Sequence, residues 1–167
     1  SETYGASKLK FPLFGDEGDD KFDKIDLRTE QNYSWNGDAE QNAHNTFVRE
    51  IFSRDMQKLM NQPYSRGRYY HLYLNGMYWG IYQTDERTDA SYANQYLGGK
   101  KADYDVIKVS PENFPYTNEV ADGNDKAWNE IYKMCTAGFK SNADYFKLEG
   151  RDENGNHVNG ARVYVDI

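Results

Sequence analysis

The sequence predicts an α+β fold, in which an antiparallel sheet packs against one helix and a mostly helical segment follows. Three observations lead to this prediction. Residues 68–85 have the composition of a β-hairpin, while residues 46–61 and 125–137 each carry the apolar spacing of an amphipathic helix. We expect a first region at residues 1–110, which holds the hairpin, and a second region at residues 111–167 with the later helices and a polar turn.

The hairpin is predicted by two Tyr-rich runs that Asn75 and Gly76 join. A two-residue type I′ turn needs positive φ at both central positions, and Asn-Gly meets this need at the least steric cost. Side chains alternate between the two faces of a strand. We therefore expect His71 and Tyr73 on one face of the first strand, and Tyr70, Leu72 and Leu74 on the other.

Before the hairpin, residues 8–14 predict an edge strand that Pro12 ends, and residues 24–28 predict a short strand. The helix at residues 46–61 has Asn45 as its expected N-cap, and Glu50 and Arg54 are expected on its outer face, four residues apart in the favourable order. Its apolar residues form one stripe, made of Phe47, Val48, Ile51, Phe52, Met56 and Leu59.

After the hairpin, residues 88–97 predict a helix that stops at Gly98, and residues 104–109 predict a strand. The helix at 125–137 is expected to end at Gly138. A short helix at 142–148 would be capped by Ser141 or Asn142, and residues 161–167 predict a last strand.

The composition narrows the possible partners. A 16% aromatic content with 15 Tyr indicates a folded chain with a polar surface. The formal charge of −7, without a Lys/Arg cluster, argues against binding nucleic acid or an anionic membrane. No run approaches the roughly 18 apolar residues that a membrane-spanning helix needs. The chain begins without Met or a signal peptide, so we expect a fragment or a processed form.

The sequence lacks the residue patterns of most familiar catalytic and metal-binding sites. Cys135 is the only cysteine, and its apolar neighbours predict a buried structural thiol rather than a nucleophile. The loop at Asp152 departs from the EF-hand spacing, so we interpret it as a tight turn. No pair of histidines has metal-ligand spacing, and no glycine-rich phosphate loop occurs. We therefore predict no metal ligand and no catalytic residue.

Two features of the sequence are open to a functional interpretation. Arg49 could form a bidentate ion pair with Glu86 after the hairpin, although a surface pair or no pair is equally compatible with the sequence. Trp79 and the surrounding tyrosines could stack on a sugar or a purine, and ordinary sheet packing is the alternative.

The hairpin residues 73–82, Tyr-Leu-Asn-Gly-Met-Tyr-Trp-Gly-Ile-Tyr, are similar to a pattern of the spore coat protein H (CotH) kinase family, with Met77 in place of a more common Glu. Glu86, Asp89 and Tyr92 follow at the family's spacing, and Arg49 matches an arginine of its first helix. The chain therefore resembles this family over residues 4–110.

The resemblance implies an atypical protein-kinase-like fold, with residues 1–110 as its small lobe and residues 111–167 as the start of the next. It implies transfer of phosphate from ATP with Mg²⁺ to protein substrates. Backbone groups of Gln83, Thr84, Asp85 and Glu86 would then meet adenine, and the helix at 46–61 would pack behind the nucleotide. The family's phosphate-contacting Lys would precede this chain and its catalytic and metal-binding Asp motifs would follow it, so we expect a piece that is inactive alone.

The alternative is a non-catalytic surface module that binds carbohydrate through Trp35, Trp79 and the tyrosines. The polar, Asn- and Tyr-rich composition suits an exported bacterial protein, so we expect an extracellular or cell-envelope location.

Overall fold

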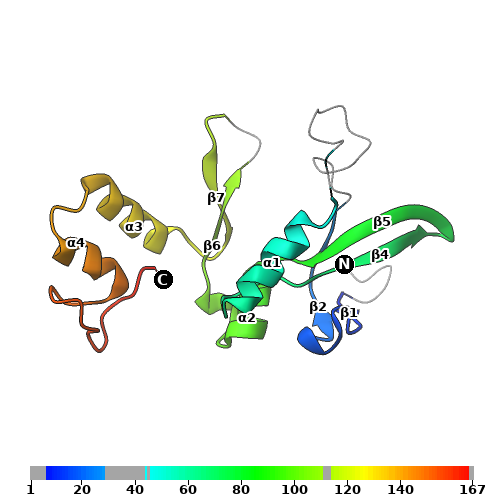
Figure 1. Cartoon of the computed structure of the whole chain (residues 1–167), viewed down its shortest axis with the longest axis horizontal. Helices are drawn as coiled ribbons and strands as arrows, with labels where there is room; N and C mark the ends of the chain where they lie inside the picture. The colour runs from blue at the N-terminus through cyan, green and yellow to red at the C-terminus, as the bar shows by residue number, and fades with distance from the viewer. Residues whose placement is uncertain (1–6, 29–43, 45, 111–113, 166–167) are drawn as a thin grey trace. The chain divides into compact units, whose positions relative to one another are not determined.

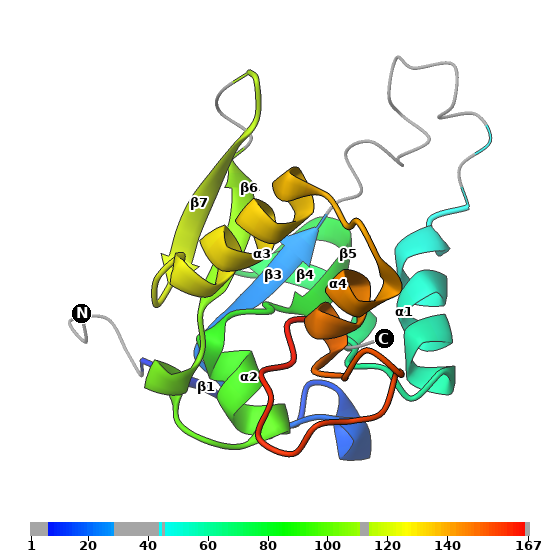
Figure 2. The same ribbon diagram turned by 90° about the vertical axis from the view of Figure 1, so that its left-hand side faces the viewer.

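A computed structural model describes residues 7–28, 44, 46–110 and 114–165 of the chain. This part is α+β, as predicted, with small antiparallel sheets and four α-helices (Figures 1 and 2). The chain divides into two compact units, residues 1–99 and 100–167. Each unit is described by itself.

The main sheet of the first unit has the strand order β3-β5-β4. Strands β4 (Gly67–Leu74) and β5 (Met77–Glu86) form the predicted hairpin, and β3 (Ile25–Arg28) pairs antiparallel with the last residues of β5 (Figure 2). In the register of β3 with β5, Ile25 lies opposite Glu86 and Arg28 opposite Gln83. The end of β5 is therefore the centre of the sheet.

The hairpin turn has the predicted geometry, because Asn75 and Gly76 have φ values of 51° and 81°. The register shifts between Leu72 and Tyr73, so that Leu72 lies opposite Gly80, and Tyr73 opposite Tyr78. Trp79 is thus the extra residue of a β-bulge. The rings of His71 and Tyr73 both contact the ring of Tyr78, at centroid distances of 5.6 and 5.2 Å, which confirms that these two residues share a face.

A second, two-stranded sheet joins β1 (Leu9–Lys10) to β2 (Lys21–Phe22), with a 3-10 turn at Gly15–Glu17 between them. The strand predicted at 8–14 is thus present but shorter. Phe14 and Phe22 are buried and meet edge to face at 5.5 Å. This aromatic pair forms the apolar core of the segment, and the Tyr70 hydroxyl donates to the carbonyl of Leu13 from the neighbouring sheet.

Helix α1 (Arg49–Leu59) starts three residues later than predicted, because Phe47 has a φ of 59° that a helix cannot contain. The expected cap, Asn45, lies outside the described residues. Asn61, with a φ of 57°, follows the end of the helix in the left-handed conformation typical of such positions.

The apolar stripe of α1 does not form a core. No residue of the helix is buried, and Val48, Phe52 and Leu59 are 50%, 62% and 72% exposed. Positions 50 and 54 lie on the opposite side of the helix from Val48, Phe52 and Leu59, whereas Ile51 lies beside Arg54 and approaches Gly67. The charged side chains at positions 50 and 54 meet polar partners on β3 and β5, so the charged side of α1 lies against the sheet.

Helix α2 (Ala90–Leu97) confirms the helix expected after the hairpin. Asp89 is its N-cap, and Oδ1 of Asp89 accepts from the backbone N–H of Ser91 at 2.8 Å and of Tyr92 at 3.2 Å. The helix ends at Gly98, whose φ of 86° favours glycine.

In the second unit, β6 (Val106–Ser110) pairs antiparallel with β7 (Thr117–Asp122). The sequence predicted β6 within two residues but not β7, whose polar residues lack strand periodicity. Because β6 pairs with β7, the compact units divide after Gly99. The lobe boundary expected near residue 110 belongs to the implied fold and stays a prediction.

Helices α3 (Lys126–Ala137) and α4 (Asn142–Phe146) confirm the two later helices, and a 3-10 turn at Lys147–Glu149 follows. Ser141 caps α4, as one of the two predicted alternatives. The strand expected at 161–167 is wrong over its described part, since residues 161–165 form no strand and the Tyr164 N–H donates to the Leu148 carbonyl at 2.7 Å.

The prediction of a buried Cys135 is also wrong, because this thiol is exposed. Helix α3 buries none of its residues, so the apolar neighbours of Cys135 do not enclose it. The described part of the chain contains no helix with the length and hydropathy needed to cross a membrane.

Candidate functional site

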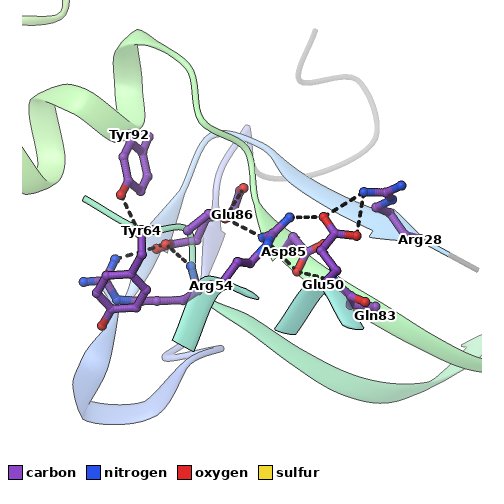
Figure 3. Close-up of polar contacts among 10 residues, drawn as sticks. Arg28, Glu50, Arg54, Tyr64, Gln83, Asp85, Glu86 and Tyr92 are labelled. Carbon is purple, nitrogen blue, oxygen red and sulfur yellow. Dashed lines mark hydrogen bonds and ion pairs between the residues drawn. The ribbon is translucent and has the colours of Figure 1, made fainter. Parts of the chain in front are cut away.

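The base of the hairpin holds a run of buried polar side chains. Gln83, Thr84, Asp85 and Glu86 are 0%, 2%, 1% and 5% exposed. Burying polar groups is costly unless they find hydrogen-bond or ionic partners. Two groups of contacts supply such partners to Asp85 and Glu86, and Figure 3 shows both. Among the described residues, Oε1 of Gln83 and Oγ1 of Thr84 are buried without a hydrogen-bond partner.

The first group surrounds Asp85. Nη1 of Arg54, on α1, lies 3.1 Å from Oδ1 of Asp85 and donates to the Ser65 hydroxyl at 2.7 Å. The amide nitrogen of Gln83 donates to both carboxylate oxygens of Asp85, at 3.2 and 3.0 Å. The buried carboxylate is therefore held from two directions.

Glu50 extends this group from α1 to β3. Nη1 of Arg28 donates to both carboxylate oxygens of Glu50 at 2.7 Å, and Nη2 of Arg54 donates to Oε1 of Glu50 (Figure 3). The predicted pair of Glu50 and Arg54 is thus confirmed, but its expected place on the outer face of the helix is wrong, because both side chains meet partners on the sheet. The chain Arg28–Glu50–Arg54–Asp85 links β3, α1 and β5, and alternating charges run along its length.

A glycine makes the close approach of α1 and β5 possible. A Cβ atom at Gly67 would lie 2.4 Å from Cδ1 of Ile51 and 2.5 Å from Oδ1 of Asp85. Both distances are shorter than a van der Waals contact. Any side chain at position 67 would therefore have to displace Ile51 of α1 or the Asp85 carboxylate.

Burial raises the pKa of Asp85 above its ordinary value of 3.8. The Arg54 guanidinium and the Gln83 amide act in the opposite direction, but they do not outweigh the loss of water around the carboxylate. The ionised form of Asp85 is therefore held at an energetic cost to the fold.

The second group surrounds Glu86. Oε2 of Glu86 accepts from the backbone N–H of Arg66 at 2.9 Å and from Nη1 of Arg66 at 3.1 Å, and Oε1 accepts from the Tyr96 hydroxyl of α2. The Arg66 guanidinium lies 3.9 Å from the ring centroid of Tyr96 and 4.7 Å from that of Tyr64. The carboxylate of Glu86 thus joins the hairpin to α2.

The surroundings of Glu86 strengthen this junction. The Tyr92 hydroxyl donates to the Tyr64 carbonyl at 2.5 Å, and the Ser65 hydroxyl donates to the Glu86 carbonyl at 2.9 Å. Burial and the hydrogen bond to Glu86 raise the pKa of Tyr96 above its usual value of 10.0. Tyr96 therefore stays a neutral donor across the physiological pH range.

The structure brings the predicted residues Gln83–Glu86 together, but it gives their ion pairs to other arginines than the expected one. Asp85 pairs with Arg54 and Glu86 with Arg66, whereas Arg49 lies at the first residue of α1. The backbone of residues 83–85 is paired with β3 on one side and β4 on the other, and the Glu86 N–H donates to the Arg66 carbonyl at 3.1 Å.

Sequence reasoning missed the roles of Arg66 and Tyr96. The register of β4 with β5 places Gly67 opposite Asp85, so the preceding Arg66 comes beside Glu86. A hairpin without a bulge would place Arg66 opposite Asp85. The bulge at Trp79 shifts the register by one residue and brings Arg66 beside Glu86, and the sequence did not predict this bulge.

Two hollows lie near these groups. One, lined by residues that include Lys24, Glu86 and Asp89, has a volume of about 10 Å³, which is room for about one water molecule. The other, of about 290 Å³, is lined by Arg28, Arg49, Glu50 and Ser53 and lies between β3 and the start of α1. Its lining combines two guanidinium groups with the Glu50 carboxylate, to which Arg28 donates.

The distal end of the hairpin carries exposed aromatic rings. Tyr73, Tyr78 and Trp79 are each more than half exposed. Nδ1 of His71 lies 3.1 Å from the Tyr78 hydroxyl. The other tryptophan proposed for sugar binding, Trp35, lies outside the described residues.

Comparison with known proteins places this architecture in a family. Neither a curated protein nor a solved structure matches the chain. A family model does match, over residues 9–156, and its description is CotH kinase protein. This match covers most of the chain, including the hairpin, α1, α2 and both sheets of the first unit, so the chain belongs to the CotH kinase family.

Proposed function

We propose that this chain forms part of the nucleotide-binding region of a CotH-type kinase that transfers phosphate from ATP, with Mg²⁺, to protein substrates. The observation that carries the proposal is the family match over residues 9–156. The first unit would correspond to the small lobe of a kinase-like fold. The composition supports an extracellular or cell-envelope location as a further part of the same proposal.

Gln83–Glu86 support this function in a different way from the one that the sequence suggested. Their side chains are buried and their backbone is paired, so they have few groups to offer to adenine. We assign them the role of fixing the base of the hairpin against α1 and α2. This rigid base would hold the residues that contact the nucleotide in place.

The hollow between β3 and α1 is our candidate for the phosphate contacts. Arg28 of β3 and Arg49 and Ser53 of α1 bring two guanidinium groups and a hydroxyl to this hollow. A phosphate would compete there with the Glu50 carboxylate, which accepts from Arg28. Guanidinium groups match the geometry of phosphate oxygens, and a helix N-terminus favours negative charge. These groups fit a phosphate chemically. We assign no residue to Mg²⁺ and none to the transfer step.

The test is binding of Mg-ATP to the 167-residue protein, followed by calorimetry and thermal shift. A ligand present at 100 times its dissociation constant stabilises a protein by about 2.7 kcal/mol. We expect Mg-ATP to raise the melting temperature and Arg28→Met to weaken the binding. Arg162→Met is the matched control, because Arg162 forms an exposed ion pair with Glu130 in the second unit.

A panel of oligosaccharides tests the alternative function with the same protein. The exposed rings of Tyr73, Tyr78 and Trp79 favour carbohydrate stacking as the second candidate. Stabilisation by an oligosaccharide, lost in Trp79→Ala and absent with Mg-ATP, would replace the kinase proposal with a carbohydrate-binding one.

A further inference from the structure

The attachment of α1 to the sheet is mainly polar. Glu50 and Arg54 of α1, with Arg28, Ser65 and Asp85 as their partners, form what we call the α1 anchor. A further ion pair joins Lys58 at the end of the helix to Glu17. The apolar contacts that accompany them include Ile51 beside Gly67 and, just before the helix, the ring of Phe47 at 5.3 Å from that of Tyr69.

Because much of the apolar stripe of α1 is exposed, the α1 anchor is the main attachment of the helix to the sheet. Most helices stay on a sheet because leaving it would expose their apolar side. Val48, Phe52 and Leu59 are exposed already, so separation of α1 from the sheet would uncover additional apolar surface mainly at the partly buried Ile51 and Met56. A free helix of the 11 residues of α1 is marginal in water, so separation would also melt it.

The hollow proposed for phosphate depends on the same docking. Arg28 comes from β3, whereas Arg49 and Ser53 come from α1. If α1 leaves the sheet, these groups separate and the hollow no longer exists. Arg54 does not line the hollow itself. It donates to Glu50, which does, and so helps to hold the α1 side of the hollow in place.

We infer that α1 opens and closes as a unit separate from the sheet, and that Arg54 is a positioning residue whose contacts with Asp85, Ser65 and Glu50 set the closed state and thereby assemble the anion-binding hollow. The first half of this inference concerns the fold alone. The second half rests on the proposed function.

Native-state hydrogen exchange on the 167-residue protein tests the first half. In the wild-type protein, the α1 amides are expected to exchange faster than those of residues 83–86, through local opening. Arg54→Met should accelerate exchange in α1 at least about tenfold, the effect of losing one strong polar contact, while the α1 amides still exchange faster than those of residues 83–86. Asp55→Asn is the control, since Asp55 is exposed on the same helix and outside the α1 anchor.

A second variant keeps the test usable if Arg54→Met does not fold. Glu50→Gln removes one charge from the α1 anchor without changing the shape of the side chain, and it should accelerate α1 exchange in the same direction. Unchanged α1 exchange in both variants, or equal exchange free energies for α1 and for residues 83–86 in the wild-type protein, would overturn the inference.

Titration with Mg-ATP tests the second half. We expect Arg54→Met to raise the dissociation constant at least about tenfold while Asp55→Asn leaves it unchanged. Faster α1 exchange with undiminished affinity would overturn the positioning role of Arg54. If the wild-type protein binds no Mg-ATP, the proposed function and the positioning role both fail, and the exchange data alone decide whether α1 opens separately.

Discussion

Arg54 on α1 and Asp85 on β5 form an ion pair at 3.1 Å whose two members are unequally buried. The side chain of Asp85 is 2% exposed, whereas that of Arg54 is 18% exposed and also contacts Glu50 and Ser65. Removing Arg54 should therefore cost more stability than removing Asp85. Asp85 is buried and Arg54 is its only cationic contact within ion-pair distance among the described residues, whereas Arg54 keeps Glu50 and Ser65 as partners.

Arg54→Met should destabilise the protein by about 2–4 kcal/mol at pH 7, because it leaves a buried carboxylate without its cation. Asp85→Asn should cost at most about 1 kcal/mol, since Arg54 keeps two other partners and Asn can still accept from Gln83. Urea unfolding measures both values. The opposite order, with Asp85→Asn the more damaging change, would contradict this account of the pair.

The raised pKa of Asp85 gives a pH dependence with a defined sign. The unfolded chain releases this proton near the ordinary value of 3.8, whereas the folded protein retains it to higher pH. Between these two pKa values the folded state binds more protons, so the contribution of Asp85 to stability is present at acid pH and falls as the pH rises. Arg54 and Glu50 of α1 and Arg28 of β3 are the charged groups that act on it.

The measurement is the unfolding free energy of the wild-type protein minus that of Asp85→Asn, between pH 3.5 and 7. We expect this difference to decrease with rising pH. The subtraction removes the other carboxyl groups, among them Asp89, whose pKa is lowered because Lys24 and the N–H groups of Ser91 and Tyr92 outweigh its burial. A difference that grows with pH would show that the Arg54 pair overcompensates the burial of Asp85.

Glu86→Ala should destabilise the protein by about 2–4 kcal/mol, because it removes the partner of the half-buried Arg66 and of Tyr96 together. Tyr96→Phe removes one hydrogen bond to a charged group and should cost about 1–2 kcal/mol. Chemical unfolding provides the comparison. Glu119→Ala is the control, because the exposed pair of Glu119 with Lys108 contributes at most about 1 kcal/mol. A Glu86→Ala protein as stable as this control would exclude the structural role of Glu86.

Gly76→Val should destabilise the hairpin by about 1–3 kcal/mol, because a β-branched residue is strained at a φ of 81°. No neighbouring atom lies within 4 Å of a Cβ at this position, so the cost would be conformational and not steric. Gly76→Asn, which tolerates positive φ, should cost less. Equal melting temperatures for the Val and Asn variants would argue against the strain.

The elements that the sequence predicted well are those with a local cause. Asn75 and Gly76 determine the turn, Asp89 caps α2, and Gly98 and Gly138 end their helices. Each of these residues acts on backbone within a few positions of itself, so the pattern can be recognised without knowledge of the fold. The sequence did not predict strand β7, because its pairing with β6, and not its own composition, makes it a strand.

The features that the sequence did not predict depend on contacts between distant segments. The apolar stripe of α1 predicts an inward side, yet Asp85 attracts Arg54 and turns the charged side to the sheet. Glu86 meets Arg66 only because the bulge at Trp79 shifts the register of the hairpin. The sequence therefore singled out Gln83–Glu86 but did not predict Arg54 and Arg66 as partners of Asp85 and Glu86, since pairing across a sheet depends on register.

The strand β5 is held on both sides only near its end, because β3 pairs with residues 83–86 while the pairing of residues 77–82 in the described part of the chain is with β4 alone. A two-stranded ribbon has little stability of its own, and its loss does not propagate easily into a three-stranded root. We therefore expect the outer half of the hairpin, around residues 72–82, to accept inserted residues, reporter groups or substitutions. The inner half, where β5 pairs with both β3 and β4, should tolerate few such changes.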